Sequence, residues 1–158
     1  MRKKFIYWLF EHSQRIYIQF KKKKPWGITS KELLLFPKET FGFQLGKMLQ
    51  ENGFELIPKV ERHDAYHLLT GYGTKVEDEI ALQYLCFANG KRSIYLYGVV
   101  IVGTLILPEY ANYYLKSYQL GKQCNQFHHF EYNRLLNYSL AELRAGIFNK
   151  QQLANIHN

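Results

Sequence analysis

Cysteine is scarce in this chain, because only Cys86 and Cys124 occur among its 158 residues. Two thiols without metal-ligand spacing exclude a disulfide framework and a cysteine-based zinc site, and they indicate a reducing compartment. We expect both to be small buried apolar side chains. No apolar run reaches the roughly 20 residues of a membrane-spanning helix, and no secretory signal is recognisable. Apolar residues at 47% and charged residues at 22% exclude wholesale disorder and a polytopic membrane protein, and the length predicts a single domain over residues 1–158.

Acidic residues are scarce at the start of the chain, where the basic residues gather. Residues 1–24 hold eight basic groups and one acid, for a net charge of +7, whereas residues 25–158 hold 13 basic and 12 acidic groups, for +1. One helical stripe of this segment contains Phe5, Leu9, Ile16 and Phe20. We expect a basic amphipathic helix that lies in the interface of an anionic membrane, packs its aromatic side chains on the core, or does both. No nucleic-acid partner is expected, because the basic groups are bunched at one end without a zinc-finger or RNA-binding signature.

Apolar spacing, capping patterns and glycine stops predict an all-helical bundle. Residues 29–32 and 74–77 each match a capping box, in which a hydroxyl and a carboxylate satisfy backbone donors at a helix start. The expected helices cover about residues 30–35, 40–52, 61–69, 74–88, 94–107, 109–120 and 130–146. The β-branched content of residues 94–107 would allow a buried strand, but the length of this uncharged run favours a buried helix. The chain after residue 146 is expected to fray.

The residues that carry chemistry lie around a glycine turn. His63 and His67 are four positions apart in an expected helix, so they share one face and can bind one ion together. Asp64 lies about 100° round the helix from His63, where it can reach the same ion or act beside it. Eleven residues separate His67 from Glu79, and a reversal of the chain through residues 71–73 would turn Glu79 toward the histidines.

Two imidazoles and two carboxylates suit a divalent metal ion, with zinc favoured and iron or manganese as alternatives. If His63, Asp64, His67 and Glu79 all bind a tetrahedral zinc, the site is closed and structural. If only the two histidines and Glu79 bind, open positions remain. Asp64 then becomes a candidate catalytic base or a residue that orients the ligands.

This pattern resembles the signature of a ubiquinone (coenzyme Q) biosynthesis family, the one named after its fourth numbered member in yeast. The signature reads His-Asp-x-x-His, eleven residues, then Glu, and the residues that match it are His63, Asp64, His67 and Glu79. Residues 37–49 are also similar to a Pro-x-x-Thr-Leu-Gly helix of the family, with Phe41 in place of Leu. The resemblance is sharp from about residue 37 to residue 87. The chain departs from the family pattern at two places. Asp78 stands where the family commonly has Gly. Before the motif, the family has the sequence Arg-Tyr-Arg-Glu, and this chain has the shorter segment of residues 60–62.

The resemblance implies an all-helical fold, a divalent metal held by the four matched residues, prenyl-lipid binding at a membrane face, and a homodimer. It implies action at ring C1 of a prenylated hydroxybenzoate precursor, where a carboxyl is removed and a hydroxyl is added. The alternative is a non-catalytic lipid-binding scaffold for other quinone-biosynthesis enzymes, with a structural metal. We expect a peripheral position on the cytoplasmic side of a membrane. A metal-dependent phosphohydrolase is a weaker rival, because the further separated His and Asp ligands of such enzymes are missing.

Overall fold

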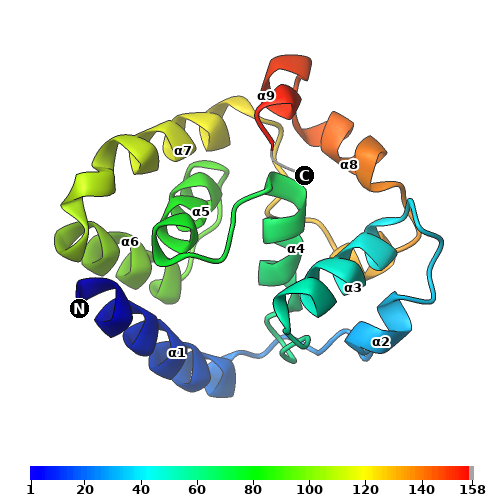
Figure 1. Cartoon of the computed structure of the whole chain (residues 1–158), viewed down its shortest axis with the longest axis horizontal. Coiled ribbons are helices and arrows are strands. Elements are labelled where there is room, and N and C mark those ends of the chain that lie inside the picture. The colour runs from blue at the N-terminus through cyan, green and yellow to red at the C-terminus, as the bar shows by residue number, and fades with distance from the viewer. Residues whose placement is uncertain (157–158) are drawn as a thin grey trace. The chain divides into compact units, whose positions relative to one another are not determined.

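The structure, a computed structural model, describes residues 1–156, and every regular element in that range is a helix (Figure 1). An isolated antiparallel bridge joins Thr40 and Ser139. The prediction of an all-helical chain is therefore confirmed. Contacts group the chain into unit 1, residues 1–21 and 72–129, and unit 2, the described part of residues 22–71 and 130–158. The single domain over residues 1–158 stays a prediction, because it concerns whether the units fold together.

Unit 1 is built from α1 (Arg2–Phe20), α5 (Val76–Ala88), α6 (Ile94–Ile106), η1 (Pro108–Tyr110) and α7 (Ala111–Gln123). Its core is a cluster of buried apolar side chains: Ile6, Val76, Ile80, Ala81, Val99, Leu107 and Tyr114. α5 and α7 lie so close that a Cβ on Gly121 would be 2.2 Å from the carbonyl oxygen of Leu85. The prediction that the helix over residues 109–120 stops at Gly121 is wrong, because this glycine lies inside α7 and serves close packing.

Unit 2 is built from α2 (Ser30–Leu33), α3 (Phe41–Asn52), α4 (Glu61–Thr70), η2 (Tyr132–Arg134), α8 (Leu140–Ile147) and α9 (Lys150–Ala154). Thr29 and Glu32 form the predicted capping box of α2. Gly53 and Gly71 end α3 and α4 in the left-handed region, which glycine adopts without a steric penalty. Buried side chains from these helices include Leu33, Phe41, Leu45, Leu49, Tyr66, Leu69 and Tyr132. This core holds α4 against α3 and α8.

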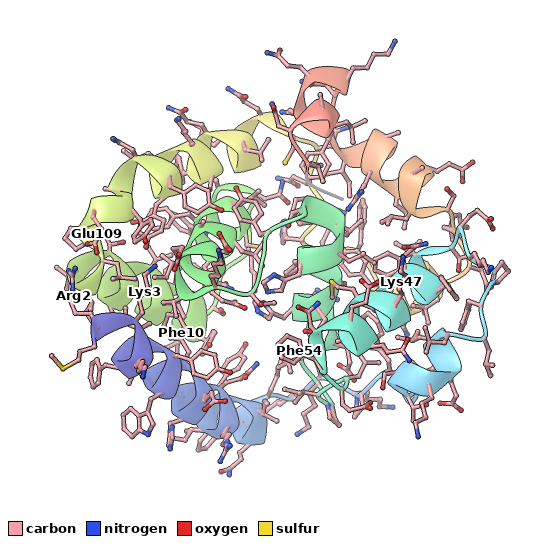
Figure 2. All side chains as sticks on the ribbon, in the orientation of Figure 1. Arg2, Lys3, Phe10, Lys47, Phe54 and Glu109 are labelled. Carbon is pink, nitrogen blue, oxygen red and sulfur yellow. The ribbon has the colours of Figure 1, made fainter. Side chains whose placement is uncertain are left out.

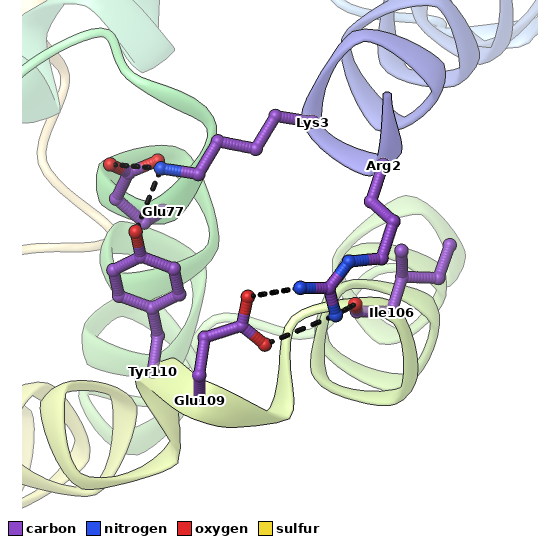
Figure 3. Close-up of polar contacts among 6 residues, drawn as sticks. All are labelled: Arg2, Lys3, Glu77, Ile106, Glu109 and Tyr110. Carbon is purple, nitrogen blue, oxygen red and sulfur yellow. Dashed lines mark hydrogen bonds and ion pairs between the residues drawn. The ribbon is translucent and has the colours of Figure 1, made fainter.

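The second predicted capping box, at residues 74–77, is wrong. α5 begins after Lys75, which makes no side-chain capping hydrogen bond. The Glu77 carboxylate instead accepts a hydrogen bond of 2.8 Å from the Lys3 ammonium group of α1, which also donates to the Tyr110 hydroxyl at 2.7 Å (Figure 3). The bonds to Glu77 and then to Tyr110 raise the pKa of Lys3 to about 12. The Glu77 carboxylate, which the local pattern assigned to the helix cap, therefore forms an ion pair with Lys3 of another helix.

The predicted helix over residues 130–146 is divided. η2 covers three residues, and α8 begins after Ser139, whose hydroxyl accepts a hydrogen bond from the backbone N–H of Glu142. α9 forms where fraying was predicted, with a capping box made by Asn149 and Gln152. Ser139 and Asn149 set the two helix starts by accepting hydrogen bonds from backbone N–H groups, and apolar spacing alone does not reveal these caps.

α6 confirms that residues 94–107 are helical, but the prediction that this helix is buried is wrong. Leu96 and Val99 are buried, whereas Ile94 and Leu105 are 89% and 76% exposed. No single helix among the described residues is long and apolar enough to cross a bilayer, although α6 joined to Pro108–Gln123, with a bend of 104°, meets the criterion by length and composition. α6 is therefore a half-buried helix with an apolar outer face.

Candidate metal centre

α4 carries both histidines on one face. Because α4 is helical from Glu61 to Thr70, His63 and His67 lie one turn apart, as predicted. Their Nε2 atoms are 3.1 Å apart, and their ring planes are 88° apart in an edge-to-face arrangement. His67 is only 4% exposed, and His63 is half-buried. The pair therefore presents two ring nitrogens to the same point.

The spacing of these ring nitrogens fits a shared metal ion. Two zinc–nitrogen bonds of about 2.0–2.1 Å put the nitrogens roughly 3.3 Å apart at a tetrahedral angle and roughly 2.9 Å apart at a right angle. The distance between Nε2 of His63 and Nε2 of His67, 3.1 Å, lies between these values. It also suits an N–H···N hydrogen bond in which one neutral ring donates to the other. The distance between the two Nε2 atoms therefore suits either a shared proton or a metal ion between them.

Arg144 of α8 holds the last turn of α4, which carries His67. Its guanidinium donates to the carbonyl oxygen of Leu68 at 2.7 Å and to that of Leu69 at 3.2 Å. Carbonyl groups in the last turn of a helix have no partner within the helix. Burial lowers the pKa of Arg144 from its ordinary value, yet an arginine side chain stays charged in proteins. Arg144 therefore caps α4 from a neighbouring helix of unit 2.

Replacing Arg144 with Met is expected to lower the free energy of unfolding by about 1–3 kcal/mol, because two carbonyl groups lose a charged donor. Urea unfolding followed by circular dichroism measures this loss. Arg134→Met is the matched control, since the Arg134 side chain is 78% exposed and forms a local ion pair with Glu131, and its expected effect is within about 0.5 kcal/mol. Equal losses in the two variants would contradict the capping role of Arg144.

The two predicted carboxylate ligands come from different units. Asp64 is half-buried on α4 in unit 2, and Glu79 is half-buried in the first turn of α5 in unit 1. His63 and His67 lie together within unit 2, on the same helix as Asp64. The histidine pair supplies two imidazole donors for a metal ion, and it does not identify the metal. Metal binding by the predicted residues stays a prediction.

The acidic neighbours of Glu79 are engaged within unit 1. Burial alone would raise the pKa of Glu77, but its hydrogen bond with Lys3 lowers the pKa below its ordinary value. Asp78 accepts a hydrogen bond of 2.9 Å from the Tyr113 hydroxyl. Burial first, and Asp78 next, raise the pKa of Tyr113 far above its ordinary value, so the phenol stays a donor at neutral pH. The Asp78 carboxylate, which stands where the family commonly has glycine, therefore binds Tyr113 of α7.

The two cysteines are poor candidates for metal ligands. Cys86 and Cys124 are free and buried, as predicted. Burial raises the pKa of each thiol to about 11, so both stay protonated at neutral pH. Metal ions bind the thiolate form of cysteine. The donors of the candidate site are therefore nitrogen and oxygen.

Comparison with known proteins yields a family and a fold. The sequence model of the coenzyme Q (ubiquinone) biosynthesis protein Coq4 matches residues 24–150, a region that begins after α1. The crystal structure of a Nostoc punctiforme protein, provisionally assigned to ubiquinone biosynthesis, is similar with a TM-score of 0.61 and 19% sequence identity, over 78% of this chain and 69% of that chain. At this identity the likeness shows the fold alone. No curated protein sequence matches significantly.

Proposed function

Because this chain belongs to the Coq4 family of coenzyme Q (ubiquinone) biosynthesis proteins, we propose that it holds one divalent metal ion through His63, His67 and Glu79. We further propose that it acts on a prenylated hydroxybenzoate precursor of the quinone, at ring C1. Zinc is the favoured ion, with iron or manganese as alternatives, since all three accept imidazole and carboxylate ligands. A homodimer and contact with other quinone-biosynthesis enzymes belong to the same proposal.

The observation that carries this proposal is the distance of 3.1 Å between the Nε2 atoms of His63 and His67. Two histidines four residues apart on a surface helix commonly diverge, with each ring in solvent. Here one ring is buried, and its Nε2 faces the Nε2 of the other. Glu79 joins the pair in this proposal because it completes the family signature. Two imidazoles and one carboxylate leave coordination positions for a substrate oxygen or water.

The roles follow from the chemistry of each group. The ion would supply a positive charge that polarises an oxygen of the substrate or of water. His63, His67 and Glu79 would fix the ion, and Asp64, beside His63 in sequence, would move a proton or orient a ligand. Exchange of the ring-C1 carboxyl for a hydroxyl releases CO2 and is a two-electron oxidation of the ring. It therefore requires an external oxidant such as dioxygen.

The scaffold alternative is supported by a different observation. His63 and His67 belong to unit 2 and Glu79 belongs to unit 1, so an ion bound by all three would tie the two units together. In that case the metal would be structural, and the activity would reside in partner enzymes. Removal of the metal would then lower the melting temperature, while prenyl-lipid binding would survive.

Glu79→Gln tests the proposed function in cells that lack their own copy of the gene. Quinone content measured by mass spectrometry is expected to fall at least about tenfold, because a neutral amide is a far weaker metal ligand than a carboxylate. Glu51→Gln is the matched control, since Glu51 is exposed and pairs with Lys47 on the same helix, and it should leave the quinone content unchanged. Normal quinone content in the Glu79→Gln strain at equal protein level would refute the proposal.

A further inference from the structure

α1 has two apolar faces. The inner face contains Ile6, which is fully buried, and Phe10, which packs against the core of unit 1 (Figure 2). The outer face carries exposed apolar side chains at helical spacing, which are Phe5, Trp8, Ile16 and Phe20. An amphipathic surface helix normally has one apolar face, directed at the core. The second face of α1 therefore indicates a partner other than the core of unit 1.

α6 shows the same organisation. Its inner face contains Leu96, Val99 and Gly103, which are buried in unit 1. Ile94, Ile101 and Leu105 are exposed and stand at positions i, i+7 and i+11, so they share the outer face. Single exposed apolar side chains are common, but a continuous apolar stripe on a helix marks an interaction surface.

The two outer stripes border one groove. α1 and α6 contact each other in unit 1, and the groove beside this contact has a volume of about 350 Å³. Its lining includes Leu9, Ile16, Tyr17, Ile94, Tyr95 and Val102. Ile16 of the α1 stripe and Ile94 of the α6 stripe both line the groove and are also exposed. Each stripe therefore extends to the edge of the groove. We call the groove with its two stripes the α1–α6 face.

Basic side chains surround this face on the α1 side. Lys4 and Arg15 are exposed and lie about a quarter turn round α1 from the apolar stripe. Arg2 donates to the carbonyl oxygen of Ile106 at 3.0 Å, which fastens α1 to the end of α6 (Figure 3). Residues 1–21, the part of this segment that belongs to unit 1, hold five basic groups and a single acid. An aromatic apolar face with a cationic rim complements an anionic lipid surface.

We propose that the α1–α6 face is a docking surface for an anionic phospholipid bilayer. α1 and α6 lie in the plane of the headgroups, the outer stripes enter the acyl boundary, and one acyl chain occupies the groove. The basic rim contacts lipid phosphates. This proposal goes beyond the proposed function, because α1 precedes residues 24–150, the region that matches the family, and because it does not depend on the metal ion.

Flotation with phospholipid vesicles tests the apolar part of the surface. The full chain is expected to bind vesicles that contain about 30% phosphatidylglycerol and to bind pure phosphatidylcholine vesicles at least about tenfold more weakly. Ile101→Glu with Leu105→Glu should weaken binding to the anionic vesicles at least about tenfold. Leu35→Glu is the control, since Leu35 is 83% exposed and belongs to unit 2. Circular dichroism of each variant checks that it is folded.

A charge-reversal pair on the other helix gives an independent test. Lys4→Glu with Arg15→Glu should also weaken binding at least about tenfold, and Lys31→Glu with Lys38→Glu, which changes the net charge equally on unit 2, should leave it unaltered. Absence of vesicle binding by the native chain, or equal losses in both charge pairs, would overturn the proposal. So would a dimer that becomes a monomer in the Ile101→Glu, Leu105→Glu variant, because the face would then be covered by a second copy.

Discussion

His67→Ala is expected to lower the affinity of the chain for its metal ion at least about 100-fold. Structural zinc sites supply about 10–16 kcal/mol, so one of three or four ligands accounts for roughly 3 kcal/mol, and each 1.4 kcal/mol is a factor of ten. The Nε2 atom of His67 faces that of His63 at 3.1 Å, and no other imidazole on α4 can replace it. Titration of the purified chain against a competing chelator measures the change.

His12→Ala is the control for this prediction. His12 is exposed on α1, and its Nδ1 bonds to the carbonyl oxygen of Trp8 in the preceding turn. Its removal changes the histidine content by the same amount without touching the candidate site, so the metal affinity should stay within about twofold. If both variants kept the native affinity, the ion would be bound elsewhere and the assignment of His67 would be wrong.

Gly121→Ala is expected to lower the free energy of unfolding by about 3 kcal/mol, which corresponds to a fall of roughly 6–12 °C in melting temperature. The added Cβ would lie 2.2 Å from the carbonyl oxygen of Leu85 and 2.9 Å from the Cβ of Ala88. These atoms belong to α5 and its backbone, so no flexible side chain can move aside. α5 and α7 must separate to admit the methyl group.

Gly98→Ala is the matched control, because it makes the same change inside another helix of unit 1. No heavy atom lies within 4 Å of a Cβ at Gly98, and alanine favours a helix over glycine by about 1 kcal/mol. The free energy of unfolding should therefore stay constant or rise by up to about 1 kcal/mol. A similar loss in Gly98→Ala and Gly121→Ala, measured by thermal and urea unfolding, would show that helix propensity and not the α5–α7 contact sets the effect.

The sequence predicts the parts of the fold that are specified locally. α3 extends from its Thr40 N-cap to a left-handed Gly53, because the signals for both ends lie within a few residues of them. The pairing of His63 and His67 was predictable for the same reason, since helical periodicity alone puts them on one face. Asp64 and Glu79 were predicted from their spacing to the histidines around the glycine turn, and the family signature matches all four residues; whether either carboxylate binds the ion stays a prediction.

The features that the sequence does not predict depend on distant residues. The Glu77 carboxylate, which the local pattern assigned to the cap of α5, binds Lys3, 74 positions away. Tyr113 binds Asp78 from 35 positions away, so no local pattern could identify this partner. The exposure of α6 is also nonlocal, because its uncharged sequence fits a buried helix until α1 and α5 are seen to cover only one side. Composition shows how apolar a helix is, and only packing shows which face is covered.

X-ray absorption at the metal edge of the purified, metal-loaded chain tests the central claim most directly. The claim predicts two imidazole ligands with metal–nitrogen distances of about 2.0–2.1 Å, at least one oxygen ligand at a similar distance, and no sulfur. The imidazole signal should be halved or lost in His67→Ala and unchanged in His12→Ala. A sulfur shell at about 2.3 Å, or a shell of oxygen alone, would contradict the site built from His63, His67 and Glu79.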